Sequence, residues 1–137
     1  MVIRKIVGDQ PAPTEAELGV LRVLWERGAS TVREVFDVIA AAKDVGYTTV
    51  LKQMQVMHQK GLLARSERFR SHVYEAAKSR SLTQRQLATS ILHQVFDGSA
   101  RGLLQSALAG RKVDAAELEE IRAVLAQVEE RNERRGK

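Results

Sequence analysis

The fold is decided by Gly46-Tyr47-Thr48-Thr49-Val50-Leu51-Lys52-Gln53-Met54, a stretch that is closed by Lys60-Gly61-Leu62-Leu63. Val50, Met54 and Met57 recur at helical spacing, which predicts a helix with one apolar face. The other face carries hydroxyl, amide and ammonium groups, which are the groups that reach phosphates and base edges: Thr48, Thr49, Lys52, Gln53, Gln55 and Gln59. Gly61 supplies the left-handed residue with which helices commonly end.

A basic hairpin is expected directly after this helix. Two short strands are predicted at residues 62–68 and 71–75, with Leu63 and Val73 facing the core. The tip at residues 69–71 has no Asn-Gly or Asp-Gly pair, so the type of its turn stays open. A polar helix that is anchored in a core and followed by a basic hairpin is the pattern of a winged helix-turn-helix, which indicates a protein that reads DNA.

Two further helices are expected before this stretch, and each begins with a capping box. Thr14-Glu15-Ala16-Glu17 opens a helix that should run to about Arg27, and Thr31-Val32-Arg33-Glu34 opens one that fades near Lys43. Three helices with short joints have the sequence form of helix-turn-helix. The expected DNA-binding domain therefore spans residues 14–78.

The remaining segments lie on either side of this domain. Residues 1–13 are expected to form an N-terminal arm, because prolines separate them from the first helix. Residues 79–137 return to helical periodicity with apolar stripes. Because the winged domain is already self-contained, it leaves these stripes without a surface to pack against. Pairing with a second copy is the economical solution, although the stripe from Leu118 to Val128 could also pack within one chain. The expected dimerisation residues are Leu87, Ile91, Val95, Leu104, Leu108, Leu118, Ile121, Leu125 and Val128.

Composition agrees with a folded, mainly α-helical protein that binds a polyanion. Hydrophobic residues make up 44% of the 137 residues and charged residues 28%, and the formal net charge is +5. Residues 46–72 hold five Lys or Arg side chains against one carboxylate, so the positive charge gathers at the expected interface. The absence of cysteine excludes disulfides and thiolate sites. No signal peptide or membrane-length apolar run is present, so a cytoplasmic location is expected.

Several blocks of the sequence, with their spacing, resemble a known family. The chain looks like the BlaI/MecI-type repressors, the penicillinase-repressor family of bacterial winged-helix regulators. The resemblance rests on Thr14-Glu15-Ala16-Glu17 with Val23-Leu24-Trp25, on Thr31-Val32-Arg33-Glu34-Val35, on Tyr47-Thr48-Thr49-Val50-Leu51 and on Lys60-Gly61-Leu62-Leu63. Beyond Ser81 only the helical pattern and the Phe96-Asp97-Gly98-Ser99 turn agree.

The resemblance implies a homodimeric transcriptional repressor that binds a palindromic DNA operator. Its recognition helix, which holds Thr48, Thr49 and Lys52, would enter the major groove, and its C-terminal helices would form the dimer. Family members commonly carry threonine where this chain has Lys52 and arginine where it has Val56, so the operator and the regulated genes stay open. The Asn-Phe cleavage site and the cysteine cluster that release relatives from DNA are both missing. An inducing protease or sensor that acts on the C-terminal helices is expected instead, with Gln105-Ser106-Ala107-Leu108 as the candidate cleavage segment, and the alternative is a ligand that binds between subunits.

Other interpretations of these residues remain open. The threonines could simply begin a helix, Tyr47 could be a packing residue, and the arginines could be a solvated hairpin edge. The favoured interpretation is DNA contact by Tyr47, Thr48, Thr49, Lys52, Gln53, Arg65, Arg68 and Arg70. Trp25, Met54 and Met57 are expected in the core, and the three histidines have no metal-ligand spacing, so neither a metal nor a cofactor is expected.

Function classes other than sequence-specific DNA binding are disfavoured. No nucleophile, paired-acid or phosphate-loop motif is present, so the chain is not expected to be an enzyme. The main alternative is a winged-helix protein–protein adaptor without specific DNA binding, but adaptors usually lose the basic hairpin. A nonspecific architectural protein would need apolar wedges or dense arginine near a minor groove, and the amide-rich helix argues against it.

Overall fold

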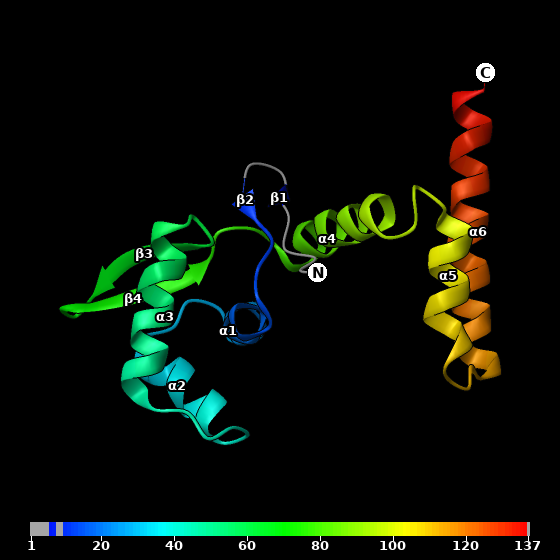
Figure 1. Ribbon diagram of the computed structural model, residues 1–137. Coiled ribbons are helices and arrows are strands. Elements are labelled where there is room, and N and C mark those ends of the chain that lie inside the picture. Colours follow the sequence, from blue (N-terminus) through cyan, green and yellow to red (C-terminus); the bar gives the residue numbers. More distant parts are fainter. Residues whose placement is uncertain (1–5, 8–9, 137) are drawn as a thin grey trace. The chain divides into compact units, whose positions relative to one another are not determined.

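A computed structural model describes residues 6–7 and 10–136, which fall into two compact units with their boundary along the chain between Val95 and Phe96 (Figure 1). The first unit contains β1 (Ile6–Val7), β2 (Gln10–Pro11), α1 (Glu15–Arg27), α2 (Val32–Ala40), α3 (Tyr47–Gln59), β3 (Leu63–Arg68), β4 (Ser71–Ala76) and α4 (Arg80–Gln94). The second unit contains α5 (Ala100–Ala109) and α6 (Ala115–Arg135). The fold is mainly helical with a small antiparallel wing, which confirms the expected winged helix-turn-helix.

The first two helices begin at the capping boxes seen in the sequence. The Thr14 hydroxyl accepts a hydrogen bond from the Glu17 amide at 3.1 Å, and the Glu17 carboxylate accepts one from the Thr14 amide at 2.9 Å. Thr31 and Glu34 make the same reciprocal pair at the start of α2. Each box satisfies two of the amides that a helix start leaves without partners, which explains why both helices begin where they do.

The ends of these helices follow the same local chemistry. Gly28 ends α1 at a φ of 85°, and Gly61 follows α3 at a φ of 85°, a conformation that side chains disfavour. The Leu62 amide donates to the Met57 carbonyl at 2.9 Å, which completes the end of α3. The second helix stops at Ala40, before the expected end near Lys43.

The core lies where α1, α2 and α3 meet the wing. Its fully buried members include Val20, Val35, Val50, Met54 and Met57, which come from the apolar faces of the three helices. The wing adds Leu63 and Tyr74, and Tyr74 is a core residue that strand alternation did not reveal. Trp25, expected in the core, is half-buried at its edge, and its indole nitrogen donates to the Lys78 carbonyl at 3.0 Å.

The wing is a two-stranded antiparallel sheet with a two-residue turn. Leu63 pairs with Ala76 and Arg68 pairs with Ser71, so only Phe69 and Arg70 remain in the turn. Both residues have a positive φ, of 52° and 66°, as in the type I′ turns that match the twist of a hairpin. Buried Ser30 pairs with Tyr74 of β4 through two backbone hydrogen bonds, which tie the joint between α1 and α2 to the wing.

The fourth helix belongs to the same compact unit as the wing. Arg80 places its guanidinium 5.7 Å from the centre of the Trp25 ring, and Thr83 is buried. Leu87 and Ile91 line a hollow of about 380 Å³ together with residues 12–15 and Leu18. The boundary expected at residue 78 falls between β4 and α4, and the unit continues through α4 to Val95.

The N-terminal arm and the second unit complete the description. Residues 1–5 and 8–9 of the arm lie outside the described residues, and β1 pairs with β2 in a short hairpin. Neither α5 nor α6 contains a buried residue. Within residues 6–7 and 10–136, no helix is both long and apolar enough to cross a membrane.

Candidate nucleic-acid interface

The exposed face of α3 is a row of polar side chains with one apolar member. With Val50, Met54 and Met57 in the core, the helical period directs the opposite face to solvent. That face holds Thr48, Lys52, Gln55, Val56 and Gln59, all of them exposed. Hydroxyl, amide and ammonium groups can hydrogen-bond to base edges in a major groove, and the Val56 methyls can contact a thymine methyl.

The other predicted contacts on this helix lie on its two flanks. Thr49 and Gln53 line a hollow with Ala16 and Gly19 of α1 and with residues at the end of α2, and Gln53 is half-buried there. Tyr47 lies on the flank that faces the wing. Its ring meets Phe36 edge-to-face at 5.6 Å between centroids, as the packing interpretation expected, and its side chain remains partly exposed.

The three predicted arginines of the wing are all exposed, but they have different partners. Arg68 forms an ion pair with Glu34 at 3.7 Å, and Glu34 also pairs with Arg27 at 3.5 Å. The Thr31 amide and side chain, with some help from the two arginines, hold the pKa of Glu34 below its ordinary value of 4.5. Among the described residues, Arg65 and Arg70 form no ion pair, so their guanidinium groups are available to an external anion.

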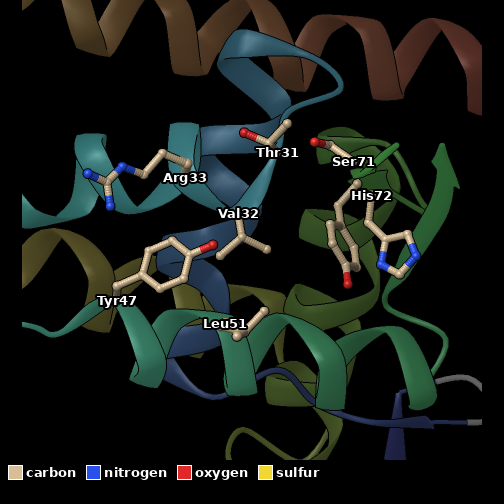
Figure 2. A pocket seen from close by; sticks show the side chains of 8 residues that line it. Thr31, Val32, Arg33, Tyr47, Leu51, Ser71 and His72 are labelled. Atoms are coloured by element: carbon tan, nitrogen blue, oxygen red, sulfur yellow. The ribbon is translucent and has the colours of Figure 1, made fainter. Parts of the chain in front are cut away.

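A cleft of about 280 Å³ separates α3 from the wing (Figure 2). Its floor is apolar, and its rim carries groups that can donate hydrogen bonds: Thr31, Arg33, Tyr47, Ser71 and His72. Figure 2 shows the Tyr47 hydroxyl directed into the cleft from one side and the His72 ring on the other. Such a rim suits a phosphate oxygen, although the nearby Glu34 carboxylate contributes negative charge.

Sequence reasoning predicted only Tyr47 of this rim as a contact, and among the members that it missed Arg33 carries the positive charge. Its guanidinium lies 5.6 Å from the centre of the Tyr47 ring and 5.7 Å from that of Phe36, so it stacks on both aromatic rings while staying exposed. The only signal in the sequence is that Arg33 occupies the first turn of a capped helix. Arg33 and Tyr47 lie in different helices, so their contact cannot be predicted from the sequence and arises from the tertiary structure.

An ion pair with a buried carboxylate holds the end of α3. The Lys60 ammonium lies 2.9 Å from the Glu17 carboxylate, and the Glu17 side chain is only 6% exposed. Burial raises the pKa of Glu17, but hydrogen bonds from Thr14 and Lys60 and the Lys60 charge outweigh it, so this pKa lies below 4.5. Glu17 thus caps α1 and fixes the last turn of α3 with the same carboxylate.

The predicted dimerisation residues are divided between the two units. Leu87 and Ile91 of α4 are half-buried within the first unit, and Val95 at its end is 48% exposed. In the second unit, Leu108, Ile121 and Val128 are half-buried, and the most exposed predicted member is Leu125, at 50%. Leu104 and Leu118 are also exposed. Within the part of the chain that the structure describes, no cluster of three or more metal-ligating side chains occurs.

Comparison with known proteins agrees with this architecture. Residues 13–127 match the penicillinase repressor family. The transcriptional regulator BlaI of Mycobacterium tuberculosis, in strains CDC 1551 and H37Rv, is 31% identical over 118 residues, which cover 84% of this chain and 83% of the relative. The crystal structure of YusO from Bacillus subtilis has a TM-score of 0.51 at 16% identity and covers 86% of this chain and 75% of that one, a likeness of fold alone. The matched family consists of transcriptional repressors rather than enzymes, and the chain belongs to this penicillinase repressor family of winged-helix regulators.

Proposed function

We propose that this repressor is a cytoplasmic homodimer that binds a palindromic DNA operator, with α3 in the major groove of each half-site. The observation that carries the proposal is the outward face of α3, where Thr48, Lys52, Gln55 and Gln59 project from a helix that the core holds rigidly. Groups on a rigid helix can be aligned with base edges, whereas the same groups on a mobile loop would lose conformational entropy on binding.

The wing and the cleft supply the contacts that position the protein. Arg65, Arg68 and Arg70 give the wing a positive charge next to α3, and the hydroxyl, imidazole and guanidinium groups of the cleft can receive a backbone phosphate between helix and wing. Phosphate contacts set orientation and affinity, and base contacts set sequence choice. We assign Thr48 and Lys52 to base edges, Tyr47 and the arginines to the backbone, and Thr49 and Gln53 to the margin of the groove.

The helices after the wing support the dimer. Neither α5 nor α6 contains a fully buried residue, and five apolar residues after the wing are exposed: Val95, Leu104, Leu118, Val124 and Leu125. A second copy would cover such surface, and twofold symmetry would set the two recognition helices about 34 Å apart, or a multiple of that, along the duplex.

The test is selection of duplexes from a random-sequence library by the full-length protein, followed by footprinting of a selected site and sedimentation of the complex. The expected result is an inverted repeat with protection on both half-sites and two protein chains per duplex. A matched selection with Lys52→Ala should return a less defined motif. Recovery of no preferred sequence would overturn the proposal and favour the protein–protein adaptor, whose binding would not depend on duplex sequence.

A further inference from the structure

The turn of the wing presents an aromatic side chain to solvent. The Phe69 side chain is 93% exposed, the highest exposed fraction of any large hydrophobic residue in the described part of the chain. The other two phenylalanines of the chain, Phe36 and Phe96, are both partly buried. A ring left in water gives up the free energy that burial would provide, so the fold itself gains little from Phe69.

The backbone of the turn also disfavours this residue. Phe69 has a φ of 52° and Arg70 a φ of 66°, and type I′ turns with two positive φ angles favour Asn and Gly. A bulky residue in this region is strained, and such strain is found where function depends on the side chain. Phe69 therefore serves neither the turn nor the core, which leaves a role in contact with another molecule.

The surroundings of Phe69 identify the kind of molecule. Arg68 and Arg70 flank it, so the apolar ring lies within a positively charged tip. The end of the hairpin extends beyond α3 in Figure 1, and the ion pair from Arg68 to Glu34 supports it against α2. A protein partner would require a broader apolar patch than one ring between two guanidinium groups, whereas a polyanion with apolar stacked bases fits both features.

This inference rests on the proposed DNA binding: we propose that Phe69 is a wedge that enters the minor groove of the bound duplex and partly separates two stacked base pairs. Arginines are attracted to the negative potential of a narrow minor groove, which places the ring at its entrance. Phenylalanine is one of the residues with which DNA-bending proteins unstack a base step and kink the duplex. A wedge on a sequence-reading protein would add preference for flexible pyrimidine–purine steps at a position outside the α3 contacts.

The test compares Phe69→Asn with Phe69→Leu on duplexes that the wild-type protein selects from a random library. Asparagine suits a positive φ, so Phe69→Asn removes the ring and should melt at the same temperature as the wild type or higher. Leucine keeps an apolar wedge. The duplexes carry 2-aminopurine at successive positions, because its fluorescence rises when its base unstacks.

The wild-type protein should raise the fluorescence at one step in each half-site, and Phe69→Leu should keep part of that rise. Phe69→Asn should abolish it and weaken binding roughly tenfold for each half-site, the change expected for losing one buried aromatic contact there. The dependence of binding on salt should not change, since no charge is removed. Equal affinity and equal fluorescence for Phe69→Asn and wild type would overturn the wedge while leaving DNA binding intact. If the wild type binds no duplex, the proposed function fails as well.

Discussion

Lys52 and Gln53 are neighbours in the chain with different surroundings. The turn of the helix directs Lys52 to solvent on the face opposite the core, and it directs Gln53 into the hollow beside α1 and α2. Both are polar residues that can contact a base edge, so composition alone assigns them the same role. Their positions around α3 separate the two roles and provide a matched pair of variants.

Lys52→Ala should weaken binding to a selected operator by roughly 1–3 kcal/mol for each half-site and relax the sequence preference, because one base contact is lost in each. Gln53→Ala should have a clearly smaller effect on the same duplex, since its side chain lies on the flank. Binding isotherms on selected and scrambled duplexes measure both. An equal loss on both duplexes for Lys52→Ala would contradict base reading by this residue.

The arginines of the wing should act through phosphate charge instead. Arg70→Ala should reduce the steepness of log affinity against log salt by about 1.8, which is about 0.9 for one phosphate contact in each half-site, and should weaken all sequences alike. Glu34→Gln should tighten binding of every duplex, because it removes the carboxylate that pairs with Arg68 and keeps a side chain that can cap α2. Titrations across a salt series measure both effects. An unchanged slope for Arg70→Ala would place this side chain away from the phosphates.

At the scale of elements, the ion pair from Glu17 to Lys60 connects the first turn of α1 to the end of α3. Because the folded-state pKa of Glu17 is depressed, the unfolded chain binds more protons below its ordinary value of 4.5. The stabilisation by this carboxylate is therefore complete above that value, and it is lost as the pH falls through the lower folded pKa.

Glu17→Ala should lower the free energy of unfolding by roughly 1–3 kcal/mol at neutral pH, since it removes both a cap and a buried partner of Lys60. Glu17→Gln should cost less, because glutamine can still complete the capping box. Denaturant melts at neutral pH and at about pH 3 measure the difference from wild type, which should shrink in acid. A difference independent of pH would mean that the charge of Glu17 does not contribute.

At the scale of the whole molecule, the proposed dimer would bury apolar surface that the single chain leaves exposed. Leu125→Asp should split the dimer, because Leu125 is 50% exposed in the single chain and its new carboxylate would lose water mainly at an interface between copies. Ala123→Asp, at an exposed position on α6 away from the Leu118–Val128 stripe, is the matched control and should sediment like the wild type.

A chain that ends at Val95 should fold as a monomer and be more stable than one that ends at Lys78, since α4 packs within the first unit. A wild-type chain that sediments as a monomer at micromolar concentration would contradict the dimer.

Release from DNA also belongs to this scale, because anything that splits the dimer removes the contribution of the second half-site. Gln105-Ser106-Ala107-Leu108 lies within α5, and its first three residues are exposed, so a protease would need to open that helix locally. Mass spectrometry of the protein from induced cells should find fragments cut in this segment, with operator binding reduced. An intact chain that still binds its operator after induction would contradict cleavage.

The sequence by itself determined the helices, their caps and the wing. Thr14, Thr31, Gly28 and Gly61 act through hydrogen bonds and backbone angles within a few residues, and such local chemistry can be predicted from the order of residues. Only the tertiary structure decided which polar residues share a surface. The contact of Arg33 with Tyr47, the pairing of Arg68 with Glu34, the burial of Tyr74 and the packing of α4 with the wing unit all join residues from different elements. Those contacts depend on how apolar faces pack against one another. Side-chain periodicity predicts which face of a helix is apolar, but it does not predict which element packs against that face.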